Sequence, residues 1–537
     1  MKQLDFLSKK IQHACAHACM KISCFSKSFC HLVSLLYRFL LFQVNLFWIQ
    51  LCYFISLSIL GFLVLRALEP KYRTGRPWDL DLFFMSASAA TVSSMATVEM
   101  EVFSNAQLLI LTLLMLVGGE VLTSIFDLQF MKARFNGKTT TMVGKIESCD
   151  PYTDPSNTSN TDPESELPIS ERLVTNYYNI HTPPSEITKY KSLTYLGYLV
   201  LTYFFIIHAV GCISIALYLI FVPSASDVLR NKNIPIPIFS IFTTVSSFAN
   251  VGFIPTNENM MVFRENSGLL LMIIPIVLAG NTLFPSCLRI AIWTRKKLSR
   301  SREADYILEN QRSIGYNHLL SGSHSVLLAL TVFGFVLVQF FLFCCMEWNS
   351  EVLDGLNTYQ KIVGVLFQSV NSRHAGESVV NLSAISPAIL VLYVVMMYLP
   401  PYTAFLPIKD NDDSSKIHNQ ENEGRNFLKV LMLSQLSYLV IFVILICITE
   451  QQKFSEDPLN FNVFNIVFEV ISAYGNVGFS MGYSCQRLLK TNSHCKDAWY
   501  GFAGRWSNKG KTILIIVMFF GRLKKFNLEG GTAWKLS

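Results

Sequence analysis

Long apolar runs separated by polar stretches dominate this chain of 537 residues. A helix crosses the apolar core of a bilayer with about 20 residues, and most of these runs reach that length. The last run is short for a span, and the first is longer than a bilayer requires. The pattern therefore predicts an all-α membrane protein with eight transmembrane helices, at about 32–68, 106–131, 193–222, 267–293, 322–346, 387–407, 427–449 and 511–523.

Between the two members of each pair of spans lies a short, half-apolar stretch that ends in small residues. Each is too short to cross a bilayer, and each lies on the outer side if the spans alternate. Backbone that re-enters a membrane without crossing it is tolerated where it is buried in protein or lines a watery cavity. We therefore expect four pore loops, near 81–94, 237–252, 361–376 and 463–478.

An internal repeat supports this expectation. The segment 245–253 aligns without gaps to 471–479, and both contain Asn-Val-Gly-Phe. A phenylalanine, Phe242 or Phe468, stands ten residues before the glycine in each copy. Two spaced matches of this length indicate a common element. The other two loops match more weakly.

The alignment defines one column, which we call the filter column: Ser94, Gly252, Gly376 and Gly478. Glycine reaches unusual backbone angles without a Cβ penalty, and a selectivity filter replaces an ion's hydration shell with backbone carbonyls. Glycines that merely pack helices are the alternative, but the matched pair favours a filter. We expect Na⁺ to be bound by carbonyls of the filter column, flanked by Val92, Ser93, Asn250, Val251, His374, Ala375, Asn476 and Val477.

The repeats predict how the chain is divided. Each repeat is a span, a pore loop and a second span, and polar segments connect the repeats. The predicted parts are a cytoplasmic arm (1–34), repeat A (35–131), a linker (132–192), repeat B (193–294), a linker (295–321), repeat C (322–407), a polar loop (408–426), and repeat D with the C-terminal tail (427–537).

Composition and charge agree with a membrane protein. Only 15% of the residues are charged, against about 25% in soluble domains. Basic residues such as Arg295, Lys296 and Lys297 cluster between spans, where they favour the cytoplasmic side. An even number of spans then places both termini in the cytoplasm. No nucleic-acid-binding module is recognisable, so we expect the bilayer, and not nucleic acid, as the partner.

Five stretches at or beside the filter column resemble the plant HKT transporters of the Trk/Ktr/HKT superfamily: 91–95, 99–101, 253–259, 371–374 and 472–479. The resemblance implies a plasma-membrane protein that moves Na⁺, or both Na⁺ and K⁺. Serine in the first loop, here Ser94, is typical of the Na⁺-selective subfamily. Related microbial proteins form dimers with one pore per subunit, so the resemblance also implies a homodimer.

Several charged residues have two interpretations. Arg522 is either a cytoplasmic anchor or, as the resemblance implies, a positive charge in the ion path below the filter. Arg373 is expected to support its loop rather than to face the axis. The carboxylates Glu99, Glu101, Glu258 and Glu377 follow filter positions, where they either concentrate cations at the mouth or are ordinary solvated charges.

Other function classes find little support. Gly137-Lys138-Thr139 and Gly510-Lys511-Thr512 resemble the end of a phosphate-binding loop but lack its leading glycine, so we expect neither an enzyme nor a cofactor. Alternating His13, Cys15, His17 and Cys19 form a weak candidate metal site in the N-terminal arm. Cys485 and Cys495 lie in a predicted outer loop, where a disulfide between them is one of two open alternatives.

Overall fold

The computed structural model describes residues 46–71, 76–147, 184–299, 301–373, 375–403, 435–488 and 495–527. These residues contain helices and no β-strand; one isolated bridge pairs Tyr483 with Ala498. The predicted all-α class is confirmed. Residues 53–129 and 159–537 form one compact unit, and every contact described below lies within it. The second unit, 1–52 and 130–158, includes the start of α2 and the end of α5.

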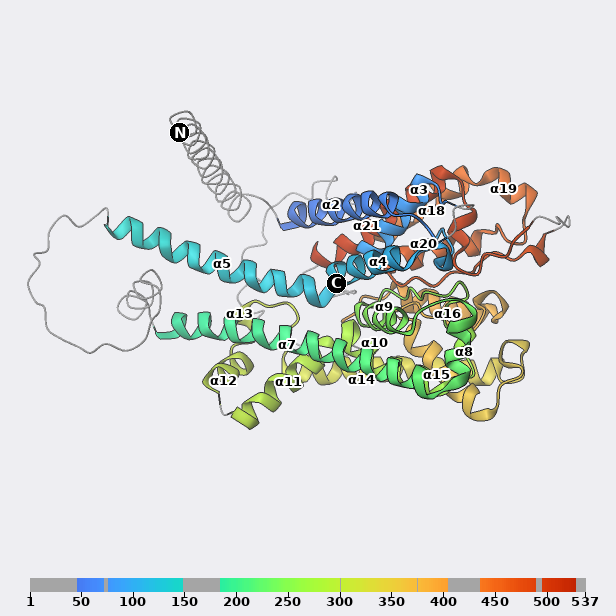
Figure 1. Ribbon diagram of the computed structural model, residues 1–537. Helices are drawn as coiled ribbons and strands as arrows, with labels where there is room; N and C mark the ends of the chain where they lie inside the picture. Colours follow the sequence, from blue (N-terminus) through green and yellow to red (C-terminus); the bar gives the residue numbers. More distant parts are fainter. Residues whose placement is uncertain are drawn as a thin grey trace, which may run out of the picture. The chain divides into compact units, whose positions relative to one another are not determined.

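Four short helices occupy the predicted pore loops. They are α3 (Asp79–Ala90), α9 (Ile236–Ala249), α15 (Thr358–Asn371) and α20 (Val463–Gly475), labelled in Figure 1. Polar caps set where two of them begin: the Asn357 side chain accepts from the backbone N–H of Gln360, and Asn462 accepts from that of Asn465. Pro235 precedes α9, whose first turn also contains Pro237.

The first helix of repeats A, B and C is long and apolar enough to cross a bilayer. These helices are α2 (Leu46–Ala67), α7 (Pro184–Phe221) and α14 (Gly322–Glu347). In repeat D, α18 (Gln435–Thr449) is shorter, and the residues before it lie outside the described part of the chain.

The second helix is broken in repeats A and B. In repeat A, α4 (Asn105–Gly118) and α5 (Glu120–Glu147) meet at an angle of 49°. In repeat B, a π-helical turn (Leu278–Thr282) separates α10 (Ser267–Val277) from α11 (Phe284–Ser299), and the bend is 92°. Pro275 inside α10 cannot donate a helical hydrogen bond, which weakens the helix just before the bend. The two second spans predicted as continuous are therefore bent pairs.

The second helices of repeats C and D differ again. In repeat C, α16 (Pro387–Tyr398) ends before Pro400 and Pro401, whereas α21 (Asn508–Asn527) of repeat D is continuous. Counting each bent pair as one span, up to five helices in the described residues qualify as membrane spans by length and composition. The count of eight stays a prediction.

Two predicted linkers contain helix. α5 continues past residue 131 to Glu147, and α7 begins at Pro184, so the 132–192 linker is helical at both ends. The 295–321 linker contains the end of α11, α12 (Arg302–Glu309) and α13 (Gln311–Ile314). Short helices α8 (Pro223–Asn231) and α19 (Gln451–Glu456) follow the first spans of repeats B and D. The arm 1–34, with its His13–Cys19 cluster, and the loop 408–426 lie outside the described residues.

Candidate selectivity filter

The pore helices deliver the filter column to one place. Each helix ends three to five residues before Ser94, Gly252, Gly376 or Gly478. All four column residues have a positive φ: 54° for Ser94, 88° for Gly252, 72° for Gly376 and 97° for Gly478. Glycine adopts this backbone freely, whereas a residue with a Cβ is disfavoured there by about 1–2 kcal/mol. The backbone thus explains the glycine column, and Ser94 is its strained exception.

Direct contacts join three sides of the filter. A Cβ placed on Gly252 would collide with the Ala375 carbonyl oxygen, and one on Gly376 would collide with that of Val477. A Cβ on Gly478 would collide with the Cβ of Ser94. Loop B therefore lies against loop C, loop C against loop D, and loop D against loop A. At these contacts the backbones approach so closely that only glycine fits.

Loops A and B are joined on the mouth side, by which we mean the side where the residues following the column lie. The Glu101 backbone N–H donates to Asn257 Oδ1, and the Asn257 N–H donates to Glu101 Oε1, both at 3.1 Å. Lys232 Nζ lies 2.6 Å from carboxylate oxygens of both Glu101 and Glu258. The four loops therefore make a closed arrangement.

Lys232 changes the electrostatics of the mouth. Burial alone would lower the pKa of Lys232, but the hydrogen bonds that Lys232 donates to Glu101 and Glu258 outweigh burial and raise the pKa. Lys232 is therefore charged at neutral pH and partly neutralises two of the carboxylates predicted at the mouth. Sequence reasoning missed Lys232, because it lies in a loop far from the column in sequence.

The other two predicted mouth carboxylates have different surroundings. Glu99 is within 3.4 Å of the Asn257 amide nitrogen. Glu377 is fully buried and accepts a 2.5 Å hydrogen bond from the Ser247 hydroxyl of α9. The interpretation of Glu377 as an ordinary solvated charge is therefore wrong. Because it follows Gly376 directly, its side chain connects loop C to the pore helix of loop B.

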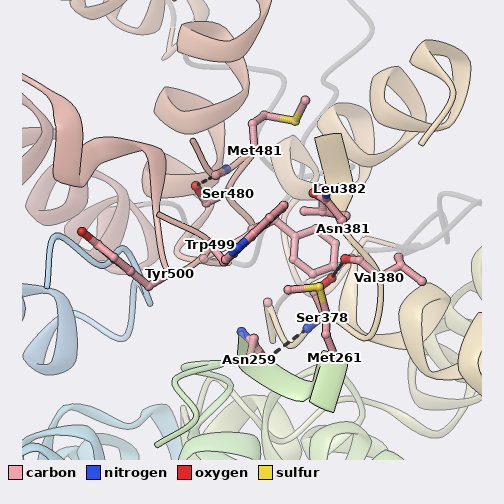
Figure 2. A pocket seen from close by; sticks show the side chains of 14 residues that line it. Asn259, Met261, Ser378, Val380, Asn381, Leu382, Ser480, Met481, Trp499 and Tyr500 are labelled. Carbon is pink, nitrogen blue, oxygen red and sulfur yellow. Dashed lines mark hydrogen bonds between the residues drawn. The ribbon is translucent and has the colours of Figure 1, made fainter. Parts of the chain in front are cut away.

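A pocket lies on the mouth side, beside the column (Figure 2). Gly376 and Gly478 contribute to its wall, together with Asn259 and the segment around Trp499. Asn259 connects loops B and C here: its Oδ1 accepts from the Ser378 N–H at 3.3 Å, and its Nδ2 lies 3.4 Å from the Gly252 carbonyl oxygen. Beyond this pocket, Cys485 and Cys495 form a disulfide.

The position two residues before the column also has a positive φ in three loops. Asn250 and Asn476, at 55° and 53°, use residues that tolerate this conformation, whereas Val92, at 61°, is β-branched. The Asn250 amide donates to the Val277 carbonyl, and that of Asn476 donates to the Met518 carbonyl. Each asparagine therefore connects its pore loop to the second helix of its own repeat. The equivalent in loop C, His374, lies outside the described residues.

The second helices also approach the pore helices through glycine. A Cβ on Gly118, Gly280 or Gly521 would collide with a carbonyl oxygen four residues before the column, on Ala90, Phe248 or Tyr474. In repeat C, Arg373 replaces this contact: its buried guanidinium donates to the Pro400 and Pro401 carbonyls at 3.0 and 3.1 Å. Arg373 therefore supports its loop, as expected.

The remaining predicted flanking residues are all buried. The carbonyls of Ala375 and Val477 form the contacts just described, and the Ser93 hydroxyl accepts a 2.7 Å hydrogen bond from Asn476 of loop D. Val251 packs with Val92 in the core between repeats A and B. Within the described ranges, no group of three or more His, Cys, Asp or Glu side chains could hold a metal ion.

Arg522 is buried in α21. Its side chain is 1% exposed, donates to the Gly118 carbonyl at 2.6 Å, and lies 3.8 Å from a Glu120 carboxylate oxygen. The guanidinium also lies over the Phe54 ring, 5.2 Å from its centroid. The interpretation as a solvent-reaching anchor is therefore wrong. Arg522 joins repeat D to the break in the second helix of repeat A.

Comparison with known proteins identifies clear relatives. The family model TrkH, described as a cation transport protein, matches residues 181–528. Cation transporter HKT1;3 of Oryza sativa subsp. japonica is 49% identical, over 98% of both chains. Sodium transporter HKT1 of Arabidopsis thaliana is 48% identical, over 88% of this chain and 91% of that protein.

Two further matches are more distant. Cation transporter HKT2;4 of Oryza sativa subsp. japonica is 39% identical, over 91% of this chain and 94% of that protein. Among solved structures, the potassium transporter TrkH from Vibrio parahaemolyticus aligns with a TM-score of 0.46 at 13% identity, covering 89% of this chain and 83% of that one.

Proposed function

We propose that this chain, a member of the TrkH cation transport family, conducts Na⁺ in preference to K⁺. Within that family it belongs to the plant HKT transporters. It is a multi-pass membrane cation transporter and not an enzyme. The ion path proposed here runs through the ring of Ser94, Gly252, Gly376 and Gly478, whose carbonyls replace water around the ion.

The strained backbone and side chain of Ser94 carry the proposed Na⁺ preference. Its φ of 54° lies in the region that disfavours a residue with a Cβ, which the three glycines of the column lack. Its Cβ and hydroxyl also occupy space against Gly478. K⁺ is the larger ion and requires a wider, more regular cage, while Na⁺ passes with part of its water retained. A difference of about 1.4 kcal/mol between the two ions is sufficient for a tenfold preference.

Conduction of K⁺ together with Na⁺ is the second candidate. Its support is the similarity to cation transporter HKT2;4 and the glycines at three of the four column positions. The two candidates differ in one measurable property, the response of the reversal potential to external K⁺.

The experiment replaces external Na⁺ by K⁺ during two-electrode recording. The native protein should follow Na⁺ and ignore K⁺, and Ser94→Gly should follow both ions. Ser88→Ala is a matched control, because the Ser88 hydroxyl is buried in α3, the pore helix that precedes Ser94, and forms no hydrogen bond. A native reversal potential that responds equally to both ions would establish the second candidate.

We further propose that Arg522 is the positive charge below the filter. Its support is the buried ion pair with Glu120 and the hydrogen bond to the Gly118 carbonyl, both at the break between α4 and α5. Gly118 in turn packs against the end of pore helix α3 at Ala90. A cation beside the path sets a barrier to a second ion. Arg522→Gln should change conductance or rectification at equal surface expression; a change in expression alone would exclude this role.

We also propose the membrane in which the protein lies, its orientation and its oligomeric state. We place it in the plasma membrane with both termini in the cytoplasm, as the basic loops around Arg295 favour, and as a homodimer by analogy with its relatives. A tag at residue 150 should be inaccessible from outside intact cells. Labelling of that tag from outside would reverse the orientation, and a monomer in size-exclusion light scattering would exclude the dimer.

A further inference from the structure

In some loops, but not in all, the segment that follows the filter column is hydrogen-bonded to a side chain of its own pore helix. In repeat D, the Met481 backbone N–H donates to Glu469 Oε1 of the pore helix at 3.1 Å. Glu469 lies nine residues before Gly478, and Met481 lies three residues after it. We call such a bond, from a pore-helix side chain to the N–H three residues after the column, a brace.

Repeats C and A contain the same brace with different acceptors. In repeat C, the Val379 N–H donates to Gln368 Oε1 at 3.1 Å. In repeat A, the Thr97 N–H donates to the Met85 sulfur at 3.5 Å. All three acceptor side chains are fully buried, where losing a hydrogen bond is costly.

Repeat B contains no brace. Thr243 occupies the position of the acceptor, and its hydroxyl is buried without a hydrogen bond. The residue three after the column is Pro255, which has no N–H to donate. Loop B is held by loop C instead, through the contacts of Asn259 and the bond from Ser247 to Glu377.

The braces also differ in strength. In repeat D a second donor, the Ser480 hydroxyl, reaches the same acceptor oxygen. In repeat C the Ser378 hydroxyl lies 3.3 Å from Gln368 Oε1 but donates more closely to the Val380 carbonyl, at 2.6 Å. Repeat D uses a carboxyl oxygen, repeat C an amide oxygen and repeat A a thioether, which is a weak acceptor. Strong braces thus support the two glycine loops C and D, while the loops of Ser94 and Gly252 are braced weakly or not at all.

We propose that Glu469 and Gln368 are positioning residues of the selectivity filter. They act through the backbone: by fixing the segment just after Gly478 and Gly376, they fix the directions of the column carbonyls on which ion discrimination depends. This inference rests on the proposed filter, but it does not depend on which ion the native filter prefers.

The test is a graded series at position 469, read as permeability ratios among Na⁺, K⁺ and Rb⁺ from reversal potentials. Glu469→Gln keeps the accepting oxygen and should stay within about twofold of the native ratios. Glu469→Met copies the acceptor of repeat A and should change them about threefold, and Glu469→Leu, with no acceptor, about fivefold or more. Reversal potentials do not depend on the number of proteins at the surface.

Two further arms complete the design. Gln368→Glu and Gln368→Leu repeat the comparison in repeat C, and Thr243→Val is the matched control in repeat B, because it removes a hydroxyl that forms no bond. If a Leu variant fails to reach the surface, Glu469→Met against Glu469→Gln still decides the question.

The proposal is overturned if Glu469→Met and Glu469→Gln give equal ratios, or if Thr243→Val changes them as much as Glu469→Leu does. A native protein without Na⁺ preference would contradict the proposed function alone, since each variant is compared with the native ratios.

Discussion

Loops A and D both have a positive φ at the same two positions, but only loop D places residues there that adopt it readily. Loop D places Asn476 and Gly478 at its two positive-φ positions, whereas loop A places Val92 and Ser94 there. Each of these two side chains costs about 1–2 kcal/mol in that conformation. Contacts from loop D offset the strain in loop A: the Asn476 amide donates to Ser93, and Gly478 leaves room for Ser94. A strained filter loop is therefore tolerated because its neighbour is built to hold it.

The largest effect should follow from filling the space between the two loops. Gly478→Ser introduces a Cβ that collides with the Cβ of Ser94 at a φ of 97°, so we expect currents to fall about tenfold or more at equal surface expression. The double variant Ser94→Gly/Gly478→Ser moves the serine from loop A to loop D and should recover much of the current. Currents in the double variant no larger than in Gly478→Ser would show that the two positions act independently.

A smaller effect should follow from removing the amide that joins the loops. Asn476→Val loses hydrogen bonds to Ser93, Ala473 and Met518 and places a β-branched residue at a φ of 53°. We expect the free energy of unfolding to fall by about 3 kcal/mol, measured as a lower melting temperature of the detergent-purified protein. Asn250→Val is the control, because Asn250 donates to the Val277 carbonyl alone. Equal losses in both variants would mean that the bonds to loop A contribute nothing.

The mouth should respond more weakly than the filter. Lys232→Met leaves Glu101 and Glu258 without their cation, so the local potential becomes more negative. We expect about a twofold to threefold higher apparent affinity for external Na⁺ at low ionic strength, and no change in permeability ratios. Lys232→Arg should behave like the native protein. An altered permeability ratio in Lys232→Met would indicate that the link between loops A and B shapes the filter itself.

The disulfide beyond loop D should have the smallest effect on transport. Cys485→Ser/Cys495→Ser should keep currents within about twofold, because the disulfide closes a peripheral loop and not the column. In the native protein, a membrane-impermeant reductant followed by an impermeant maleimide should label both cysteines in intact cells. Labelling only after the cells are permeabilised would contradict the predicted outer position of this loop.

The repeat made most of the fold and the filter column predictable. Apolar runs and the Asn-Val-Gly-Phe match located four pore helices, because a common backbone requires similar residues where φ is positive. The braces left no such signal. Their donors are backbone N–H groups, which nearly every residue has, and their acceptors, Met85, Gln368 and Glu469, are three different residue types. The 92° bend in repeat B and the mouth link of Lys232 depend on tertiary contacts, so the apolar pattern could not reveal them.

The contact between Gly478 and Ser94 bears on how such a filter could arise. In a homotetramer, every substitution occurs in all four subunits, so a serine in the column would meet another serine at the interface where Gly478 now meets Ser94. Four identical subunits could therefore not accept this serine without rebuilding the ring. A chain that carries four separately encoded loops can change one quarter and keep glycine in the next. One chain with four loops can therefore form an asymmetric column, which rotational symmetry excludes for a homotetramer.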